Sequence, residues 1–481
     1  MHQPAVARAQ RKKNSCRNCR KWAKRVGELE ARITELEEEL AKANKNSENS
    51  SKPPSSDIVK PSSSKGTKIK RKRGGQPGHP RHEREAFPTE LIDEFLEYPL
   101  DHCPDCAGKM QPADLEPKIV QQIEIKTRPT IISQHRASAY WCATCEKFYY
   151  DAPLPSIVEK GGLAGPRLTA FVAYLKGAGH ASFSTIRKFL RDVVGIKVSR
   201  GYLAKLINKL SRALKDPYEE LFGSLADQPV LNIDETGHKD SGKQFWTWCS
   251  RAELFVLFNI DPSRSADVLI DVLGEEFDGV IGCDYFGAYR RYMRECNIMV
   301  RICLAHLIRD VKFLMKLPDS KERAYGKRLR EGLRDLFAII HEREGSNDEE
   351  FENILSFQRD ELIRLATPRV PPGNHAQAIA KRFRQHGDSY FRFITTPGIE
   401  PTNNLAERAI RFVVIDRKVT QGSCGQNGQN WCARIWTAMA TLTAQDRSAF
   451  EYLYEAVLAH WKGMPVPSLL PATVQGPVQL E

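Results

Sequence analysis

Residues 229–317 decide the fold of the largest part of the chain: PVLNIDETGHKDSGKQFWTWCSRAELFVLFNIDPSRSADVLIDVLGEEFDGVIGCDYFGAYRRYMRECNIMVRICLAHLIRDVKFLMKL. Short runs rich in β-branched and aromatic residues alternate here with stretches of helical period. In order, the pattern predicts strand VLNID, strand QFWTWCS, strand ELFVLFNI, helix SADVLIDVL, strand VIGCD, helix GAYRRYMREC, strand IMVRIC and helix AHLIRDVKFLMKL.

This succession is typical of a ribonuclease-H-like mixed sheet, in which the first and fourth strands are neighbours. The acids that end these two strands, Asp234 and Asp284, are then expected side by side, because right-handed crossovers bring the carboxyl ends of parallel strands to one edge. A third acid, Glu407, lies in PTNNLAERAIR, which reads as a helix capped near Thr402 or Asn403.

Two aspartates and one glutamate on separate elements are suited to hold two divalent cations, which attack and release a phosphate oxygen in line. Each acid alone has an ordinary interpretation. Asp234 and Asp284 fit helix caps or turns, and Glu407 fits a surface ion pair with Arg411. We interpret the three together, in this order, as a catalytic metal site.

Other side chains are expected around this site. His306 follows the fifth strand, so it either contacts the scissile phosphate or is a hydrogen-bonded structural histidine. Basic residues of the Glu407 helix would position phosphates without reading base sequence; they are Arg408, Arg411, Arg417 and Lys418.

Composition limits the class of protein. The 481 residues carry a formal net charge of +12, which suits a polyanionic partner. The sequence shows no apolar stretch of membrane-spanning length and no secretory signal. We therefore expect a cytoplasmic bacterial protein, associated with the nucleoid and with no membrane partner. In that compartment the 12 cysteines point to metal more than to disulfides.

The amino-terminal part predicts self-association. Apolar residues recur at spacings of three and four, as in a coiled coil, and a monomeric amphipathic helix is the alternative. They are Trp22, Val26, Leu29, Ile33, Leu36, Leu40 and Ala43. Cys16 and Cys19 precede them as a single CxxC pair, which is either two free thiols or half of a zinc site shared in a dimer.

Residues 44–64 are Ser, Asn, Pro and Lys with almost nothing to bury, which predicts a disordered linker. A cationic arm follows, which fits phosphate contact or a solubilising tail equally well. Its basic residues are Lys65, Lys68, Lys70, Arg71, Lys72 and Arg73.

Two CxxC pairs, Cys103 with Cys106 and Cys142 with Cys145, flank a segment that alternates like a strand. This is the layout of a zinc ribbon with one structural Zn²⁺, and four thiolates leave no open position for catalysis. The spacing between the two pairs is longer than in common zinc fingers, so we expect a hairpin to close the gap.

Residues 163–215 have a helical period broken by Gly177, Gly179 and Gly195. The period fits a DNA-reading helix-turn-helix or a plain helical linker domain. Its basic residues include Arg187, Lys188, Arg191, Lys197, Arg200 and Lys205.

These pieces together resemble the transposases of the insertion sequence 66 family over nearly the whole chain. The resemblance rests on NSSKPPSSD, RGGQPGHPRH, the CPDC and CATC pairs, NIDET, CDYFGAYRRY, CLAHLIRD, and NNLAERAIR followed by DRKVTQGS. It implies a DDE transposase with Asp234, Asp284 and Glu407 as the triad, Mg²⁺ as the metal and an all-helical insertion before Glu407. The chain departs from the usual family residues at Tyr285 and Leu304.

We therefore expect a multidomain α+β protein that hydrolyses DNA at transposon ends and transfers the strand to target DNA, using two Mg²⁺ ions or Mn²⁺ in their place. The alternatives are a catalytically silent DNA-binding repressor and a nuclease without strand transfer. Accessory proteins of the element are possible partners.

The expected parts are 1–46 (basic end and coiled coil), 47–85 (linker and arm), 86–155 (zinc ribbon), 160–222 (helical region), 225–440 (catalytic core, with a helical insertion at about 317–395) and 441–481 (helical end and tail).

Overall fold

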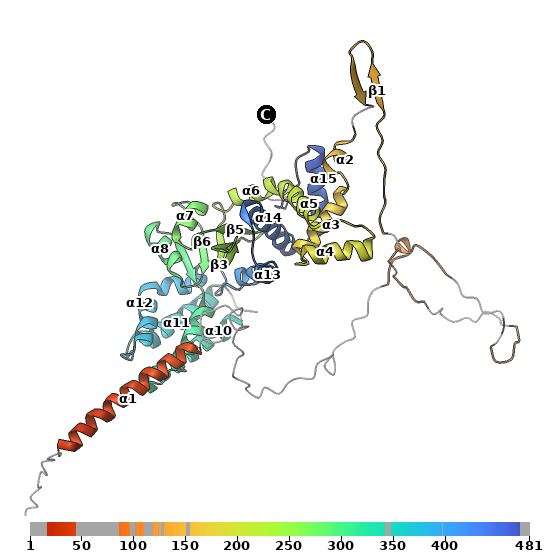
Figure 1. Ribbon diagram of the computed structural model, residues 1–481. Helices are drawn as coiled ribbons and strands as arrows, with labels where there is room; N and C mark the ends of the chain where they lie inside the picture. Colours follow the sequence, from red (N-terminus) through yellow and green to blue (C-terminus); the bar gives the residue numbers. More distant parts are fainter. Residues whose placement is uncertain are drawn as a thin grey trace, which may run out of the picture.

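The computed structural model describes residues 17–44, 86–96, parts of 102–150, 154–341, 348–396 and 398–471 (Figure 1). The described part is a mixed α and β protein, with a central sheet, helices on both of its faces, and separate helical groups beside it.

The central sheet has the strand order β5-β4-β3-β6-β7. Its strands are β3 (Val230–Asp240), β4 (Lys243–Arg251), β5 (Val256–Asp261), β6 (Val280–Cys283) and β7 (Met299–Ile302). The β3–β4 and β4–β5 pairs are antiparallel, and the β3–β6 and β6–β7 pairs are parallel. The first and fourth strands of this core, β3 and β6, are neighbours, as the sequence predicted.

Strand β3 is longer than the sequence indicated, because it continues past Asp234 to Asp240. Ser241 and Gly242 form the two-residue connection to β4, with φ of 50° and 80°. Positive φ at both positions is typical of the type I′ hairpin, whose twist matches that of the flanking strands. The polar segment GHKD is therefore strand and not loop, and Asp234 lies within β3 instead of ending it.

Different helices cover the two faces of the sheet. Helices α13 (Asn404–Thr420) and α14 (Gly425–Ala444) pack on β3, β4 and β5. On the other face, Tyr289 of α8 (Gly287–Glu295) contacts the ring of Trp248 of β4, and α8 packs against α7 (Ala266–Leu273). Branched side chains such as Leu231, Ile281 and Ile302 fill the layers between them.

Helices fill the chain between β7 and α13. Helix α9 (Leu304–Leu314) follows β7 directly, and α10 (Ser320–His341), α11 (Asp348–Ala366) and α12 (Asn374–Thr395) pack together beside the sheet. No strand is present among the described residues of this segment. Helix α12 bends at His386, where φ is −135°.

The helical region before the sheet is joined to the carboxyl-terminal end of the chain. It consists of α2 (Ser156–Gly161), α3 (Pro166–Gly177), α4 (Phe183–Phe189), a π-helical turn (Leu190–Val194), α5 (Arg200–Ala213) and α6 (Lys215–Gly223). Helices α3 and α5 pack against α14 and α15 (Ala449–Lys462), so these segments form one helical group (Figure 1).

The amino-terminal elements extend from this body. Helix α1 (Arg17–Ala43) keeps its apolar stripe exposed, with Ile33 55% and Leu40 62% exposed. Strands β1 (Ala139–Cys142) and β2 (Lys147–Tyr150) form a hairpin that projects from the rest (Figure 1). A short 3₁₀ turn, η2, covers Thr89–Leu91.

Candidate active site

The pairing of β3 with β6 places Asp234 beside Asp284. Parallel pairing runs from Val230 opposite Val280 to Asn232 opposite Gly282. Asp234 and Asp284 are each two residues beyond that last pair, so they occupy equivalent positions on the two neighbouring chain segments. The sequence prediction of two neighbouring aspartates at this edge therefore agrees with the register.

Alternation along β3 gives Asp234 the face that is covered by α13. Thr236 accepts a hydrogen bond from Arg417 of α13 at 2.8 Å, and His238 contacts Trp436 of α14. Side chains two apart on a strand share a face, so Asp234 points to the same side. Glu235 points to the other side, where the hydroxyl of Tyr289 donates to it.

Glu407 reaches the site because three hydrogen bonds hold the start of α13 and the residues before it. The side-chain amide of Asn403 donates to the Ile233 carbonyl at 2.8 Å, next to Asp234. The Asn403 backbone N–H donates to the Cys303 sulfur at 3.2 Å, and Leu304 N–H donates to Pro401 O at 3.0 Å. Asn403 precedes α13, as predicted, but its side chain binds β3 and does not cap the helix.

The charges of Asp284 and Glu407 both act on Asp234. Burial raises the pKa of Asp234 well above its usual value, and the negative charges of Glu235, Asp284 and Glu407 raise it further. Burial and the charge of Glu235 raise the pKa of Asp284 to about 6, against a hydrogen bond from Phe286 N–H and the nearby Arg264. A site of this kind is stabilised by a cation among the carboxylates.

Two residues of α9 lie beside Glu407, and one of them, Arg309, binds it. Arg309 Nη2 lies 3.4 Å from Glu407 Oε2, and His306 Nδ1 lies 3.6 Å from Oε1. The guanidinium of Arg309 also lies 3.2 Å from His306 Nε2. Burial and the charge of Arg309 lower the pKa of His306 to about 4, so the imidazole is neutral near pH 7. His306 thus lies beside the third acid, and its contact with a scissile phosphate stays a prediction.

A tighter group of possible metal ligands surrounds Glu407. Within the described residues, Cys303, His306 and Glu407 place three ligand atoms within 4.8 Å of one another. Burial raises the pKa of the Cys303 thiol, which keeps it protonated and makes it a poor ligand. Asp234 and Asp284 are not members of this group, and a wider spread of carboxylates is what a pair of cations about 3.5–4 Å apart requires.

The roles of Glu235 and Arg264 had no signal in the sequence. The buried carboxylate of Glu235 accepts two hydrogen bonds from Arg264, at 2.5 and 2.9 Å. The guanidinium of Arg264 packs on the rings of Trp246 and Phe286, at 4.6 and 3.8 Å from their centroids. Glu235 is thereby occupied by protein partners. The position of Arg309 near the site could have been inferred from the sequence, because residues three apart on a helix lie on one face and Arg309 follows His306 by three.

Most of the predicted phosphate-contacting residues that the structure describes are exposed. Arg187, Lys188, Arg191, Lys197, Arg200, Lys205, Arg408, Arg411 and Lys418 all lie at the surface. Arg417 differs, because its guanidinium donates to Thr236 Oγ1 and Gly237 O and holds α13 on β3. The cationic arm with Lys70, Arg71, Lys72 and Arg73 lies outside the described residues.

The predicted zinc ligands are described in part. Cys142 and Cys145 lie at the turn of the β1–β2 hairpin, where hydrogen bonds from the backbone and side chain of Cys145 lower the pKa of Cys142. Cys106 lies in a turn between the bridged residues His102 and Lys109. Cys103, like Cys16 at the amino end, lies outside the described residues.

Comparison with known protein families identifies the chain. Residues 161–430, more than half of the chain, match the family described as "Transposase IS66 family". The chain belongs to the IS66 transposase family. It is therefore a transposase-family enzyme that acts on DNA, and the match covers Asp234, Asp284 and Glu407.

Two further comparisons extend beyond this match. Residues 1–85 match a family of unknown function, DUF6444. The IS66-family chain is also 21% identical over 452 residues to the uncharacterized protein y4qI of Sinorhizobium fredii, covering 84% of this chain and 80% of that protein. Of the helices described, none has the length and apolar character needed to cross a membrane.

Proposed function

We propose that this IS66-family protein is a DDE transposase, with a ribonuclease-H-like core and with Asp234, Asp284 and Glu407 as its catalytic carboxylates. It would hydrolyse DNA at the transposon ends and then transfer the freed strand to target DNA. The observation that supports the proposal is geometric: the β3–β6 pairing ends two residues before both Asp234 and Asp284, and Asn403, four residues before Glu407, binds the Ile233 carbonyl next to Asp234.

The donor set fits divalent cations. Glu407 Oε1 is buried and has no hydrogen-bond partner, and its side chain is only 14% exposed. A buried, unpaired carboxylate oxygen beside two further acids is the environment that a hard cation satisfies with oxygen ligands. Asp234, Asp284 and Glu407 would hold two Mg²⁺, or Mn²⁺ in their place, which polarise the attacking oxygen and stabilise the leaving oxygen.

The remaining residues position the reacting groups. Arg309 binds Oε2 of Glu407 and orients the carboxylate, and the neutral His306 lies beside Oε1 without a hydrogen bond to it. Asn403 fixes the start of the helix that carries it. The exposed Arg408 and Arg411 on the same helix are available for backbone phosphates.

The other parts of the chain would bind DNA and assemble the enzyme. The exposed basic residues of α4 and α5, including Arg187 and Lys188, would contact transposon ends, together with the arm at Lys70–Arg73. Cys103, Cys106, Cys142 and Cys145 would hold one structural Zn²⁺. The exposed stripe of α1 would pair with a second copy of the chain.

The test replaces each acid by its amide. Asp234→Asn, Asp284→Asn and Glu407→Gln keep shape but remove the charge that attracts the cations, so cleavage of labelled end DNA with Mg²⁺ should fall by roughly 10³-fold or more. DNA binding should persist, because the basic arm and helical region lie outside the core.

Glu400→Gln is the matched control, since this exposed acid lies seven residues before Glu407. Activity that survives Glu407→Gln and disappears with Glu400→Gln would show that the third ligand is misassigned. Cleavage by the unchanged protein without any joined product would instead favour a nuclease.

A further inference from the structure

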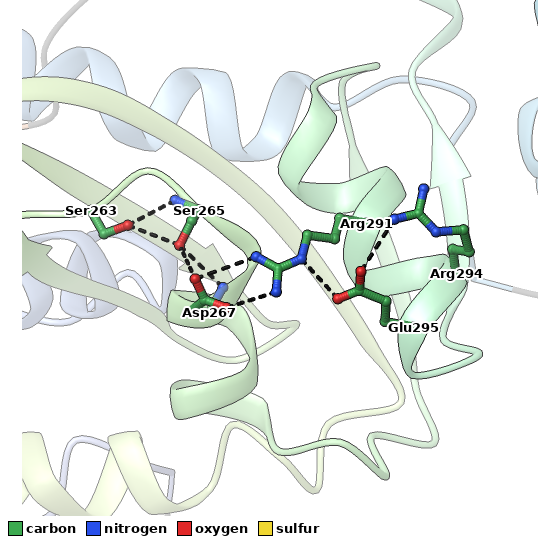
Figure 2. Close-up of polar contacts among 6 residues, drawn as sticks. All are labelled: Ser263, Ser265, Asp267, Arg291, Arg294 and Glu295. Carbon is green, nitrogen blue, oxygen red and sulfur yellow. Dashed lines mark hydrogen bonds and ion pairs between the residues drawn. The ribbon is translucent and has the colours of Figure 1, made fainter.

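The arginines of helix α8 differ in their partners. Arg291 pairs with Asp267 and Glu295, and Arg294 pairs with Glu295, as Figure 2 shows for the outer side of this helix. Arg290 has no ion-pair partner among the residues that the structure describes, and its Nε is buried without a hydrogen-bond partner. The residue remains partly exposed, so an outside group can reach the guanidinium.

Arg290 shares an aromatic ring with a second arginine. The guanidinium carbons of Arg290 and of Arg382 in α12 lie 4.4 and 4.3 Å from the ring centroid of Tyr285. Tyr390, one turn beyond the bend of α12, stacks on the same ring at 6.4 Å. Cation–π contact and this packing hold both cations in place without neutralising either of them.

The charges of this cluster do not balance. Asp310 of α9 pairs with Arg382 at 2.7 Å, which compensates one of the two cations on Tyr285. The positive charge of Arg290 is left over, beside another guanidinium and near His386, whose pKa is lowered by burial and by this charge. An anion between the arginines would relieve their repulsion and accept hydrogen bonds from the guanidinium of Arg290.

The cluster adjoins the candidate active site. Tyr285 directly follows Asp284 in the chain, and Arg382 pairs with Asp310 of α9, next to Arg309 of the same helix, which binds Glu407. An anion bound here would lie next to the scissile group. Among the partners of a DNA-acting enzyme, the backbone phosphate is the anion that guanidinium forks bind best.

We propose that Arg290 and Arg382, held on Tyr285, bind a backbone phosphate of the DNA strand adjacent to the phosphodiester that is cleaved. The inference rests on the proposed function, and it gives the helical insertion a role in substrate binding, because α12 supplies Arg382. Tyr285 is a point where this chain departs from the usual family residue, and here it is the platform for both cations.

The experiment measures the affinity of the full chain for a labelled duplex carrying the element's end, without Mg²⁺, over a range of salt. Arg290→Met should reduce the slope of log affinity against log salt by about 0.7–0.9, the value of one phosphate contact. Arg294→Met, on the same helix with the same loss of charge, should change the slope less. Arg290→Lys keeps the charge and stem and should restore most of the slope.

A second measurement identifies the phosphate. Neutral methylphosphonate groups are placed one at a time along the strand near the cleavage position. One position should weaken binding of the unchanged protein and leave binding of Arg290→Met unaffected. Identical profiles for both proteins, or equal losses for Arg290→Met and Arg294→Met, would overturn the inference. Neither binding measurement requires cleavage. If the proposed catalysis is wrong, the protein without substitutions will bind end DNA but will not cut it, and the binding results still test the inference.

Discussion

A buried arginine near the candidate active site makes Gly282 hard to replace. Arg301 of β7 is 1% exposed and donates to the Asn232 side chain of β3 at 2.6 Å across strand β6. Gly282 of β6 lies between them. A Cβ at this position would overlap Arg301 Nη2 and would lie 2.6 Å from Asn232 Oδ1. Gly282→Ala must therefore displace the guanidinium, the amide or strand β6.

The size of the effect follows from these contacts. Overpacking of a buried site costs about 1–3 kcal/mol, and loss of a hydrogen bond to a charged group about 1.5–3 kcal/mol. The two costs do not add fully, because side chains that move to relieve the overlap are the ones that lose the hydrogen bond. Gly282→Ala should therefore lower the free energy of opening of the sheet by about 2–5 kcal/mol. Asp284 lies two residues further on, so DNA cleavage should also fall.

Amide hydrogen exchange is the suitable assay, because it reports the free energy of opening segment by segment in a chain of several parts. Peptides covering β3 and β6 should exchange faster in Gly282→Ala. Gly201→Ala is the control, since the nearest atom to the added Cβ, Ser199 Oγ, would lie at 3.9 Å, an ordinary van der Waals contact.

A double variant tests the cause. In an Arg301→Met background the clash at Gly282 is with a flexible, uncharged side chain, so Gly282→Ala should cost less than in the unchanged protein. Unaltered exchange in β6, or the same penalty in both backgrounds, would refute the reasoning.

Three further outcomes are expected. Ile33→Pro should break α1 and weaken self-association, and an unchanged mass by light scattering would place the interface elsewhere. Metal analysis should find about one zinc per chain, lost in Cys142→Ser, and a normally folded metal-free protein would exclude the ribbon site. Asn403→Ala leaves the buried Ile233 carbonyl without its donor, which should cost about 1–3 kcal/mol of local stability. Amide hydrogen exchange in the first turn of α13 should be faster and DNA cleavage should fall. Full activity would show that this bond does not place Glu407.

The fold of the sheet was largely predictable because its signals are local. The runs VLNID, QFWTWCS and VIGC are rich in β-branched and aromatic residues, and the crossover rules then place β3 beside β6. The end of β3 was missed. The residues GHKDSGK contain glycine, aspartate and serine, which indicate a turn, yet only Ser241 and Gly242 turn and the rest pairs with β4.

The candidate site was predictable where one element carries one acid. Asp234, Asp284 and Glu407 were each predicted from the segment around them, and their catalytic role stays a prediction. The partners that set their environment were not, because Arg264 and Arg382 reach the site across long stretches of chain. Arg417 shows the same limit, since a basic residue on an amphipathic helix gives no local sign that it will bind Thr236 on β3.

One hydrogen bond, that from Leu304 N–H to Pro401 O, closes the segment that contains α9 and the helical insertion. The chain between them is therefore a closed loop, and the entropy of closing a loop changes by only about 0.6 kcal/mol for each doubling of its length. The length of this segment can thus change at little cost in closure entropy, whereas α12 is also held by its packing on β7. An engineered chain that rejoins the end of α9 to Pro401 would keep the three acids and lose Arg382. Residues of the insertion that bind DNA would then be open to exchange without a change in the acids.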